Sequence, residues 1–369
     1  MKNIPMGAAA ALALALSLGG CTREGHQAPE NVVNVYSWPI FIAPDTVANF
    51  ERETGIKVNY DTFETDEVQE TKLLVGHSNY DVVVPGDLAF ERELHAGVFR
   101  KLDKAALPNL VNLDPQVMSE LARHDPGNLY AIPYSWTTTG LAYDVDKVRE
   151  RLGSSEFDSW SLLFDPANAA RLADCGITII DSPTDVFPTV LYYLGKDPNR
   201  HDLKDLDEAS DVLMRIRPFV RWIVSVGNVE GVSRGERCLA LNFSGDMAAA
   251  GFRAAEARNG VVIRYFIPRE GSYRSIDAVA IPADAPHPQN ALKWLNYLMR
   301  PDVMAAITNT TKFPNGNRAA LPLVDEAIKH NPAVYPDAEA QGRLHTLTAM
   351  PPDYLRHMTR LWTTFRTGS

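Results

Sequence analysis

The stretch from Val32 to Pro85 constrains the fold more than any other part of this sequence. It contains three short apolar runs, at residues 32–36, 56–60 and 80–84. Between them lie two segments with apolar residues at helical spacing, and these predict helices that end at Gly55 and Gly76. The pattern predicts a β-α-β-α-β unit. Its strands must lie parallel, because helices connect them.

Two segments follow the carboxyl ends of these strands and are candidates for a binding site. An open parallel sheet binds its ligands beyond that edge. The first segment carries Trp38 and Phe41, and the second carries Gly86 and Asp87. Asp87 has an alternative interpretation as the N-terminal acid of the helix predicted over 88–96, where the helix dipole stabilises it.

The rest of the chain predicts a second set of elements. Strands at 129–134 and 139–143, on either side of a threonine-rich passage, predict a first crossing between two lobes, and the run 261–268 predicts the return. Other predicted elements are strands at 177–180, 238–243 and 278–282 and helices at 186–194, 203–216, 289–299 and 353–366. Two lobes that the chain enters more than once imply a cleft between them.

The N-terminus reads as a secretion signal. In residues 1–21, Lys2 precedes an apolar run that is too short to span a bilayer. The run ends in Leu18-Gly19-Gly20-Cys21, which resembles the bacterial lipobox and predicts acylation of Cys21; a plain cleaved signal is the alternative. Residues 22–30 are predicted to form a polar tether.

Charge and cysteine content narrow the class of partner. The formal net charge of −10 disfavours nucleic acid and anionic membranes and suits a cationic small molecule. Cys175 and Cys238 could pair in an oxidising compartment or remain as buried free thiols. No metal-binding spacing is present, and neither a metal nor a cofactor is expected.

Acidic and aromatic residues after strand or loop ends suggest what such a cleft binds. The carboxylates are Asp185, Asp246 and Asp277, and the aromatic residues are Trp38, Phe41, Phe243 and Phe313. Carboxylates pair ammonium groups, while aromatic walls cover a methylene chain and attract cations. Acidic residues scattered over surface loops are the alternative interpretation.

Over residues 35–364 the chain resembles the polyamine-binding proteins, the putrescine and spermidine receptors of bacterial ABC importers. The matching passages are 42–51, 53–58, 80–85, 138–140, 193–199, 295–298 and 300–303. The resemblance implies an α/β fold of the two-lobe, type II periplasmic-binding-protein class, in which each lobe is a mixed, mostly parallel sheet flanked by helices. Lobe 1 is expected to comprise residues 31–136 and about 266–305, and lobe 2 residues 137–265 and about 306–369.

The resemblance also implies roles for individual residues. Trp38, Asp246 and Asp277 match the family's putrescine pocket, the two acids being those that hold ammonium groups, and Cys175 and Cys238 match a disulfide. Asp185 stands where glutamate is usual, and Phe41 where tyrosine is usual. Further departures are Ile40 for aspartate, Pro39 and Gly86 for serine, Phe243 for tryptophan, Ser275 for phenylalanine and Phe313 for tyrosine.

These departures remove one carboxylate and several hydroxyl groups from the implied pocket. An unpaired buried ammonium costs several kcal/mol, so Asp87 is a candidate for the replacement acid. Arg274 is close in sequence to Asp277 and could neutralise it or bind a ligand carboxylate, but a solvated surface position is the simpler expectation.

The expected function is a monomeric periplasmic receptor that binds a putrescine-like polyamine between its lobes and delivers it to an inner-membrane ABC permease. The altered pocket leaves room for another amine, an amino acid or a guanidino compound. A sensor lipoprotein without a transport role is a further alternative. No acid–base pair or nucleophile indicates an enzyme.

Overall fold

A computed structural model describes residues 31–368 of the chain. The predicted signal segment at 1–21, the acylation of Cys21 and the tether at 22–30 lie outside the described residues. These three remain predictions from the sequence.

The first elements follow the predicted β-α-β-α-β order. β1 (Val32–Ser37), β2 (Lys57–Thr62) and β3 (Val82–Val83) lie parallel in the order β2-β1-β3. α1 (Thr46–Thr54) ends at Gly55, whose φ of 69° is left-handed and suits glycine. α2 (Asp66–Leu74) begins after Thr65, whose hydroxyl accepts a hydrogen bond from the Val68 N–H. The prediction for this part of the chain is confirmed.

A second parallel group is formed by the middle of the chain. β5 (Ile177–Ile179), β6 (Val220–Ile223) and β7 (Leu239–Phe243) lie in the order β7-β5-β6. The helices that follow or connect these strands are α8 (Pro183–Tyr193), α9 (Leu203–Ile216) and α11 (Ser244–Ala257). β5, β7, α8 and α9 were predicted from their apolar periodicity, whereas β6 and α11 were not predicted.

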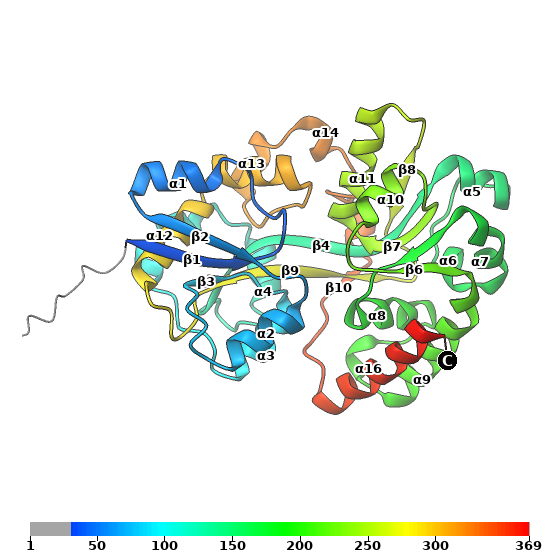
Figure 1. Ribbon diagram of the computed structural model, residues 1–369, viewed down its shortest axis with the longest axis horizontal. Coiled ribbons are helices and arrows are strands. Elements are labelled where there is room, and N and C mark those ends of the chain that lie inside the picture. The colour runs from blue at the N-terminus through cyan, green and yellow to red at the C-terminus, as the bar shows by residue number, and fades with distance from the viewer. Residues whose placement is uncertain (1–30, 369) are drawn as a thin grey trace, which may run out of the picture. The chain divides into compact units, whose positions relative to one another are not determined.

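Two long strands, β4 (Ala131–Asp144) and β9 (Ser272–Ala280), run from one group of strands to the other (Figure 1). β4 pairs antiparallel with β9 over 131–138 and with β7 over 139–143. The prediction of two strands around a threonine-rich passage is therefore wrong. The β-branched threonines continue a single strand, as their side chains favour.

The run at 261–268 was predicted to return the chain to the first lobe, and that prediction is also wrong. It forms β8 (Ile263–Phe266), which pairs with residues 141–144 of β4 on the side of the second group. The return is made instead by β9, which begins six residues before the predicted strand at Ala278. Polar residues at the start of β9 hid it from an analysis based on apolar runs.

The remaining elements surround these two groups of strands. The other helices are α3 (Asp87–His95), α4 (Pro115–Leu121), α5 (Val145–Leu152), α6 (Ser161–Phe164), α7 (Pro166–Leu172), α10 (Asn228–Ser233), α12 (Pro288–Leu298), α13 (Pro301–Thr311), α14 (Glu326–Lys329), α15 (Ala338–Gln341) and α16 (Pro352–Thr367). Short 3-10 helices occur at Lys104–Ala106, Pro108–Asn112, Ala173–Cys175, Pro198–Arg200, Arg217–Phe219 and Arg318–Leu323, and β10 (Leu344–His345) pairs parallel with β9.

The segment after α13 packs with the elements of the first group. The Asn317 side chain donates a hydrogen bond to the Met299 carbonyl at 2.8 Å, and Asn317 also forms a β-bridge with Leu113. α16, in contrast, packs against α8 and α9. We therefore propose that lobe 1 continues to about residue 341, rather than ending near 305 as expected.

Cys175 and Cys238 form a disulfide with their Cα atoms 5.5 Å apart. This confirms the pairing that the family resemblance implied. The bond ties the end of the 3-10 helix Ala173–Cys175, two residues before β5, to the residue before β7, and it closes a long loop. In the chain-entropy description, such a loop contributes about 4 kcal/mol to the free energy of unfolding.

Candidate functional site

Four of the predicted site residues line a small cavity of about 50 Å³. They are Gly86, Asp87, Asp185 and Ser275. Asp87 is the first residue of α3, Asp185 lies in the first turn of α8, and Ser275 lies in β9. The fold therefore brings two helix N-termini and one strand of different parts of the chain to a single place.

Asp87 is 4% exposed and fixed by three hydrogen bonds. One carboxylate oxygen accepts from the Leu88 N–H at 2.9 Å and from the Ser275 hydroxyl at 3.0 Å, and the other accepts from the Ile276 N–H at 3.0 Å. Burial raises the pKa of Asp87. Its expected place as an N-terminal helix acid is confirmed, and it also lines the cavity, while its role as a ligand-binding acid stays a prediction.

Asp185 reaches the cavity from the start of α8. It accepts hydrogen bonds from the Ser182 hydroxyl and from the Tyr273 hydroxyl, the latter at 2.5 Å. Burial raises the pKa of Asp185, and the negative charges of Asp87 and Glu67 add to the shift. The carboxyl group is thus held in place by hydroxyl groups rather than by a cation.

Asp277 lies two residues beyond Ser275 on β9 and forms a β-bridge with Gly86. Its carboxylate accepts a hydrogen bond from the Ser135 hydroxyl at 2.6 Å. Burial raises the pKa of Asp277 to about 8, and the Asp66 and Asp87 carboxylates add to the shift. The Trp38 side chain lowers the pKa of Asp277, although the buried indole N–H of Trp38 has no hydrogen bond of good geometry among residues 31–368.

Asp66 is a cavity residue that the sequence analysis missed. It opens α2, lines the cavity and accepts a hydrogen bond from the Gly86 N–H at 3.1 Å. Burial raises its pKa to about 7, and Glu67 and Asp185 add to the shift. The available signal was its position after the carboxyl end of a parallel strand, the same reasoning that selected Asp87.

Phe41 and Phe313 form an aromatic contact beside this group of acids. Their ring centroids are 5.3 Å apart with the planes at 75°. A Cβ atom added to Gly245, in the first turn of α11, would lie 2.6 Å from the Phe313 ring. The ring therefore rests directly on the backbone of α11, and glycine is required at this contact.

Phe243 and Asp246 occupy the start of α11 and do not line the small cavity. Burial raises the pKa of Asp246 to about 6, and the charge of Glu230 adds to the shift. The Asp246 side chain makes no ion pair within residues 31–368. The Phe313 ring lies close to this acid, because it covers the adjacent Gly245.

Arg274 is not the solvated surface residue that was expected. It is 7% exposed, pairs with Glu120 at 2.8 Å and lies 4.5 Å from the centroid of the Trp136 ring. Successive residues of a strand point to opposite faces, so Arg274 and Asp277 project from opposite faces of β9. Because Arg274 pairs with Glu120, the structure does not support the expectation that Arg274 neutralises Asp277.

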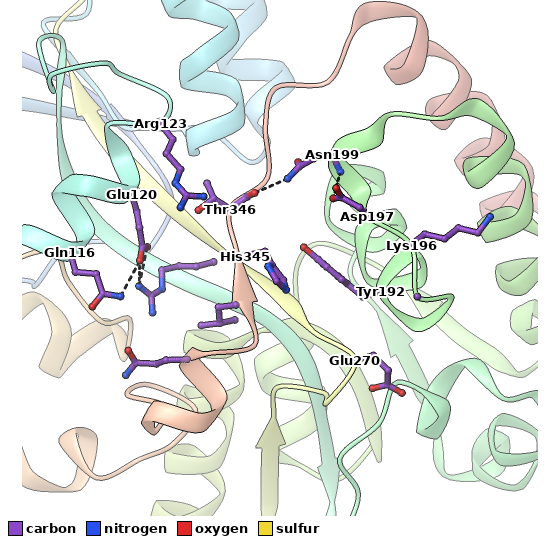
Figure 2. Close-up of a pocket in the computed structure, with 14 residues that line it drawn as sticks. Gln116, Glu120, Arg123, Tyr192, Lys196, Asp197, Asn199, Glu270, His345 and Thr346 are labelled. Atoms are coloured by element: carbon purple, nitrogen blue, oxygen red, sulfur yellow. Dashed lines mark hydrogen bonds and ion pairs between the residues drawn. The ribbon is translucent and has the colours of Figure 1, made fainter.

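A larger cavity of about 660 Å³ lies on the Arg274 side of β9. Figure 2 shows Gln116 and Glu120 on one side of it and Tyr192, Asp197 and Asn199 on the other, with β10 crossing between them. Arginine, lysine, aspartate and glutamate all contribute to its walls. None of the predicted ligand-binding residues lines this cavity.

Residues 45–336 match a family described as bacterial extracellular solute-binding proteins. The chain is a bacterial extracellular solute-binding protein. The match covers most of the length of the chain and includes the start of α1, β9 and every acid around the small cavity. The resemblance to receptors of bacterial importers is confirmed at this level.

Individual relatives of this solute-binding protein agree with that assignment. It is 45% identical to the putrescine-binding periplasmic protein SpuD of Pseudomonas aeruginosa, over 96% of this chain and 97% of the relative. It is 44% identical to the putrescine-binding periplasmic protein PotF of Escherichia coli, over 98% of this chain and 97% of the relative.

A solved structure described as a spermidine/putrescine ABC transporter from Listeria monocytogenes has the same fold. It superposes with a TM-score of 0.82 at 29% identity, covering 92% of this solute-binding protein and all of the other chain. The predicted two-lobe α/β fold of type II is thereby confirmed.

Within residues 31–368, no group of three or more histidine, cysteine, aspartate or glutamate side chains is arranged to hold a metal ion. Across the same residues, none of the helices combines the length and apolar character needed to cross a bilayer.

Replacing Gly245 by alanine is expected to destabilise the solute-binding protein by roughly 1–3 kcal/mol, because the new methyl group displaces the Phe313 ring. Gly251→Ala is the matched control in the same helix, since its Cβ would meet nothing closer than the Ile263 Cβ at 3.9 Å. Alanine at 251 is expected to be neutral or to stabilise by up to about 1 kcal/mol. Urea denaturation measures both, and equal effects would contradict the contact.

Proposed function

We propose that this chain binds a polyamine of the putrescine type between its lobes and delivers it to an inner-membrane ABC permease. The names of its relatives support this function, since SpuD and PotF are putrescine-binding periplasmic proteins. An amine ligand accounts for the acidic site of this protein, whose family is extracellular. The ligand is bound and released unchanged, so no chemical step is assigned to the chain.

One observation from the structure carries the proposal. Burial raises the pKa of four acids, Asp66, Asp87, Asp185 and Asp277. Negative charges within this set add to the pKa shifts of Asp66, Asp185 and Asp277. Among the ion pairs of residues 31–368, no lysine or arginine is joined to any of the four; Asp87 has only His124, at 3.7 Å. Arg92 also lines the cavity and lowers the pKa of Asp66, but its ion pair is with Glu70. Desolvated carboxylates that outnumber their cations are costly, and a ligand with two ammonium groups reduces that cost.

The proposed ligand contacts are the residues predicted from the sequence, with Asp66 added. Trp38, Phe41, Phe243 and Phe313 supply aromatic surface for the methylene chain. Gly86 and Ser275 leave space next to Asp87, because neither has a large side chain. Asp185 and Asp277 bind ammonium groups through their carboxylates, and Asp246 contributes from the start of α11.

Lobe closure is the proposed source of selectivity. The four acids come from both lobes, since Asp66, Asp87 and Asp277 lie in elements of the first group and Asp185 opens α8 of the second. A cation that touches both sets stabilises the arrangement in which the lobes meet. Binding shifts the equilibrium between open and closed forms by that difference in contacts.

Removing one carboxylate is expected to weaken putrescine binding strongly. Asp185→Asn and Asp277→Asn should each raise the dissociation constant by at least about thirtyfold, because a charged partner is lost in a desolvated site. Titration calorimetry with putrescine, cadaverine, spermidine and agmatine measures this and ranks the amines. Asp211→Asn is the control, since Asp211 is exposed on α9. Absence of heat with all four amines would refute the proposal.

Putrescine affinity is also expected to rise with pH. The pKa values of about 8 for Asp277 and about 7 for Asp66 mean that both acids are partly protonated near neutrality in the free receptor. Each must lose its proton to pair with an ammonium group, so binding should weaken at least about tenfold from pH 9 to pH 6. Calorimetry at several pH values tests this, and a flat profile would contradict it.

We further propose that the receptor is a monomer anchored in the membrane through an acylated Cys21. The support is the sequence Leu18-Gly19-Gly20-Cys21 after an apolar run and a set of acids that one chain provides by itself. The intact mass of protein from the membrane fraction should exceed that of the cleaved chain by the mass of the acyl groups. Cys21→Ser should release the protein into the soluble fraction, and an unmodified mass would exclude the anchor.

A further inference from the structure

His124 lies buried behind one of the cavity acids. It follows α4 and is 2% exposed. Its Nδ1 is 2.7 Å from the Glu91 carboxylate, and its Nε2 is 3.7 Å from the Asp87 carboxylate. Asp87 and Glu91 are four residues apart in α3 and therefore lie on the same face of the helix. One imidazole ring thus lies between two carboxylates.

The two ring nitrogens have unequal surroundings. Nδ1 is satisfied by Glu91, which also accepts a hydrogen bond from the Ala349 N–H at 3.1 Å. Nε2 is buried and has no hydrogen-bond partner within residues 31–368. A protonated imidazole carries an N–H on both nitrogens, which directs a positive charge toward Asp87.

The charges around His124 favour the protonated form. Burial lowers the pKa of His124, but the hydrogen bond to Glu91 and the charges of Asp87 and Glu91 raise it above its ordinary value. The positive charge of the neighbouring Arg123 lowers the pKa of His124, and the charge of His95 lowers the pKa of Glu91. These are the charged groups that α3 and the end of α4 present to the ring.

We propose that His124 is the resident counter-ion of Asp87, and that a ligand ammonium group bound at Asp87 replaces it by driving off its proton. The inference rests on the proposed function, because it needs a cationic ligand in the cavity that Asp87 lines. Two positive charges on either side of one desolvated carboxylate repel each other. The arriving charge therefore favours the neutral ring.

The proton leaves Nε2 and passes to solvent, while the Nδ1–H continues to donate to Glu91. No other bond forms or breaks, and one positive charge departs as one arrives. Asp87 is thereby paired both in the free receptor and in the complex. His124 acts through Asp87 and does not contact the ligand, which makes it a positioning residue.

Nuclear magnetic resonance of the histidine rings tests the proposal directly. The full receptor is titrated with acid and base, free and with saturating putrescine, and the His124 signal is assigned with the His124→Gln variant. The pKa of His124 is expected to fall by about one pH unit or more when putrescine is bound. A purely structural histidine would show no such change.

His357 is the matched control within the same spectra. It pairs with Asp207 at 2.7 Å, on the outer side of α16, and putrescine should leave its titration unchanged. In Asp87→Asn, at a putrescine concentration that restores saturation, the shift at His124 should be lost. This variant does not depend on folding of a protein that lacks His124.

Three results would overturn the inference. The first is an unchanged His124 titration while calorimetry shows bound putrescine, which leaves the proposed function intact. The second is a shift that persists in Asp87→Asn, because His124 would then respond to the ligand by another route. The third is the absence of any putrescine binding by calorimetry, which refutes the proposed function and this inference with it.

Discussion

The alternation of side chains along β9 determines how the site is built. Tyr273, Ser275 and Asp277 project from one face, where they meet Asp185, Asp87 and Ser135 respectively. Arg274 projects from the other face and is held by Glu120 and Trp136. A strand with period two thus collects the acids on one side and removes the nearest arginine to the other. The small cavity has more acids than cations, since Arg92 and Arg274, which also line it, are paired with Glu70 and Glu120.

Helix N-termini make that charge tolerable where no lysine or arginine is paired with the acids. Asp66, Asp87 and Asp185 all lie in the first turn of a helix, where the free N–H groups and the dipole favour a negative side chain. Hydroxyl groups from Ser135, Ser182, Tyr273 and Ser275 supply further donors. These neutral donors orient the carboxylates without neutralising them, which leaves their charge available to a ligand.

The sequence predicted most of the helices and parallel strands. Glycine after a helix, an acid in its first turn and the spacing of apolar residues are local signals. It also selected Asp87, Asp185 and Ser275, which the fold brings to one cavity. It failed where the outcome depends on strand pairing: β8 pairs beside β7, and β9 starts at Ser272. The place of Arg274 was missed for the same reason, since its orientation follows only once residue 274 is known to lie in a strand. His124 meets Asp87 through a tertiary contact that no local pattern encodes, whereas Asp66 follows the carboxyl end of β2 and could have been selected by the same reasoning as Asp87.

The central claim is that the acidic site between the lobes is shaped for an organic dication. The most direct measurement is mass spectrometry of the small molecule released from receptor that was purified without unfolding. The account predicts release of a molecule with two or more amino groups, such as putrescine, in about one equivalent per chain. Release of an anion or a neutral sugar, retained by the wild-type protein and by Asp185→Asn alike, would contradict it.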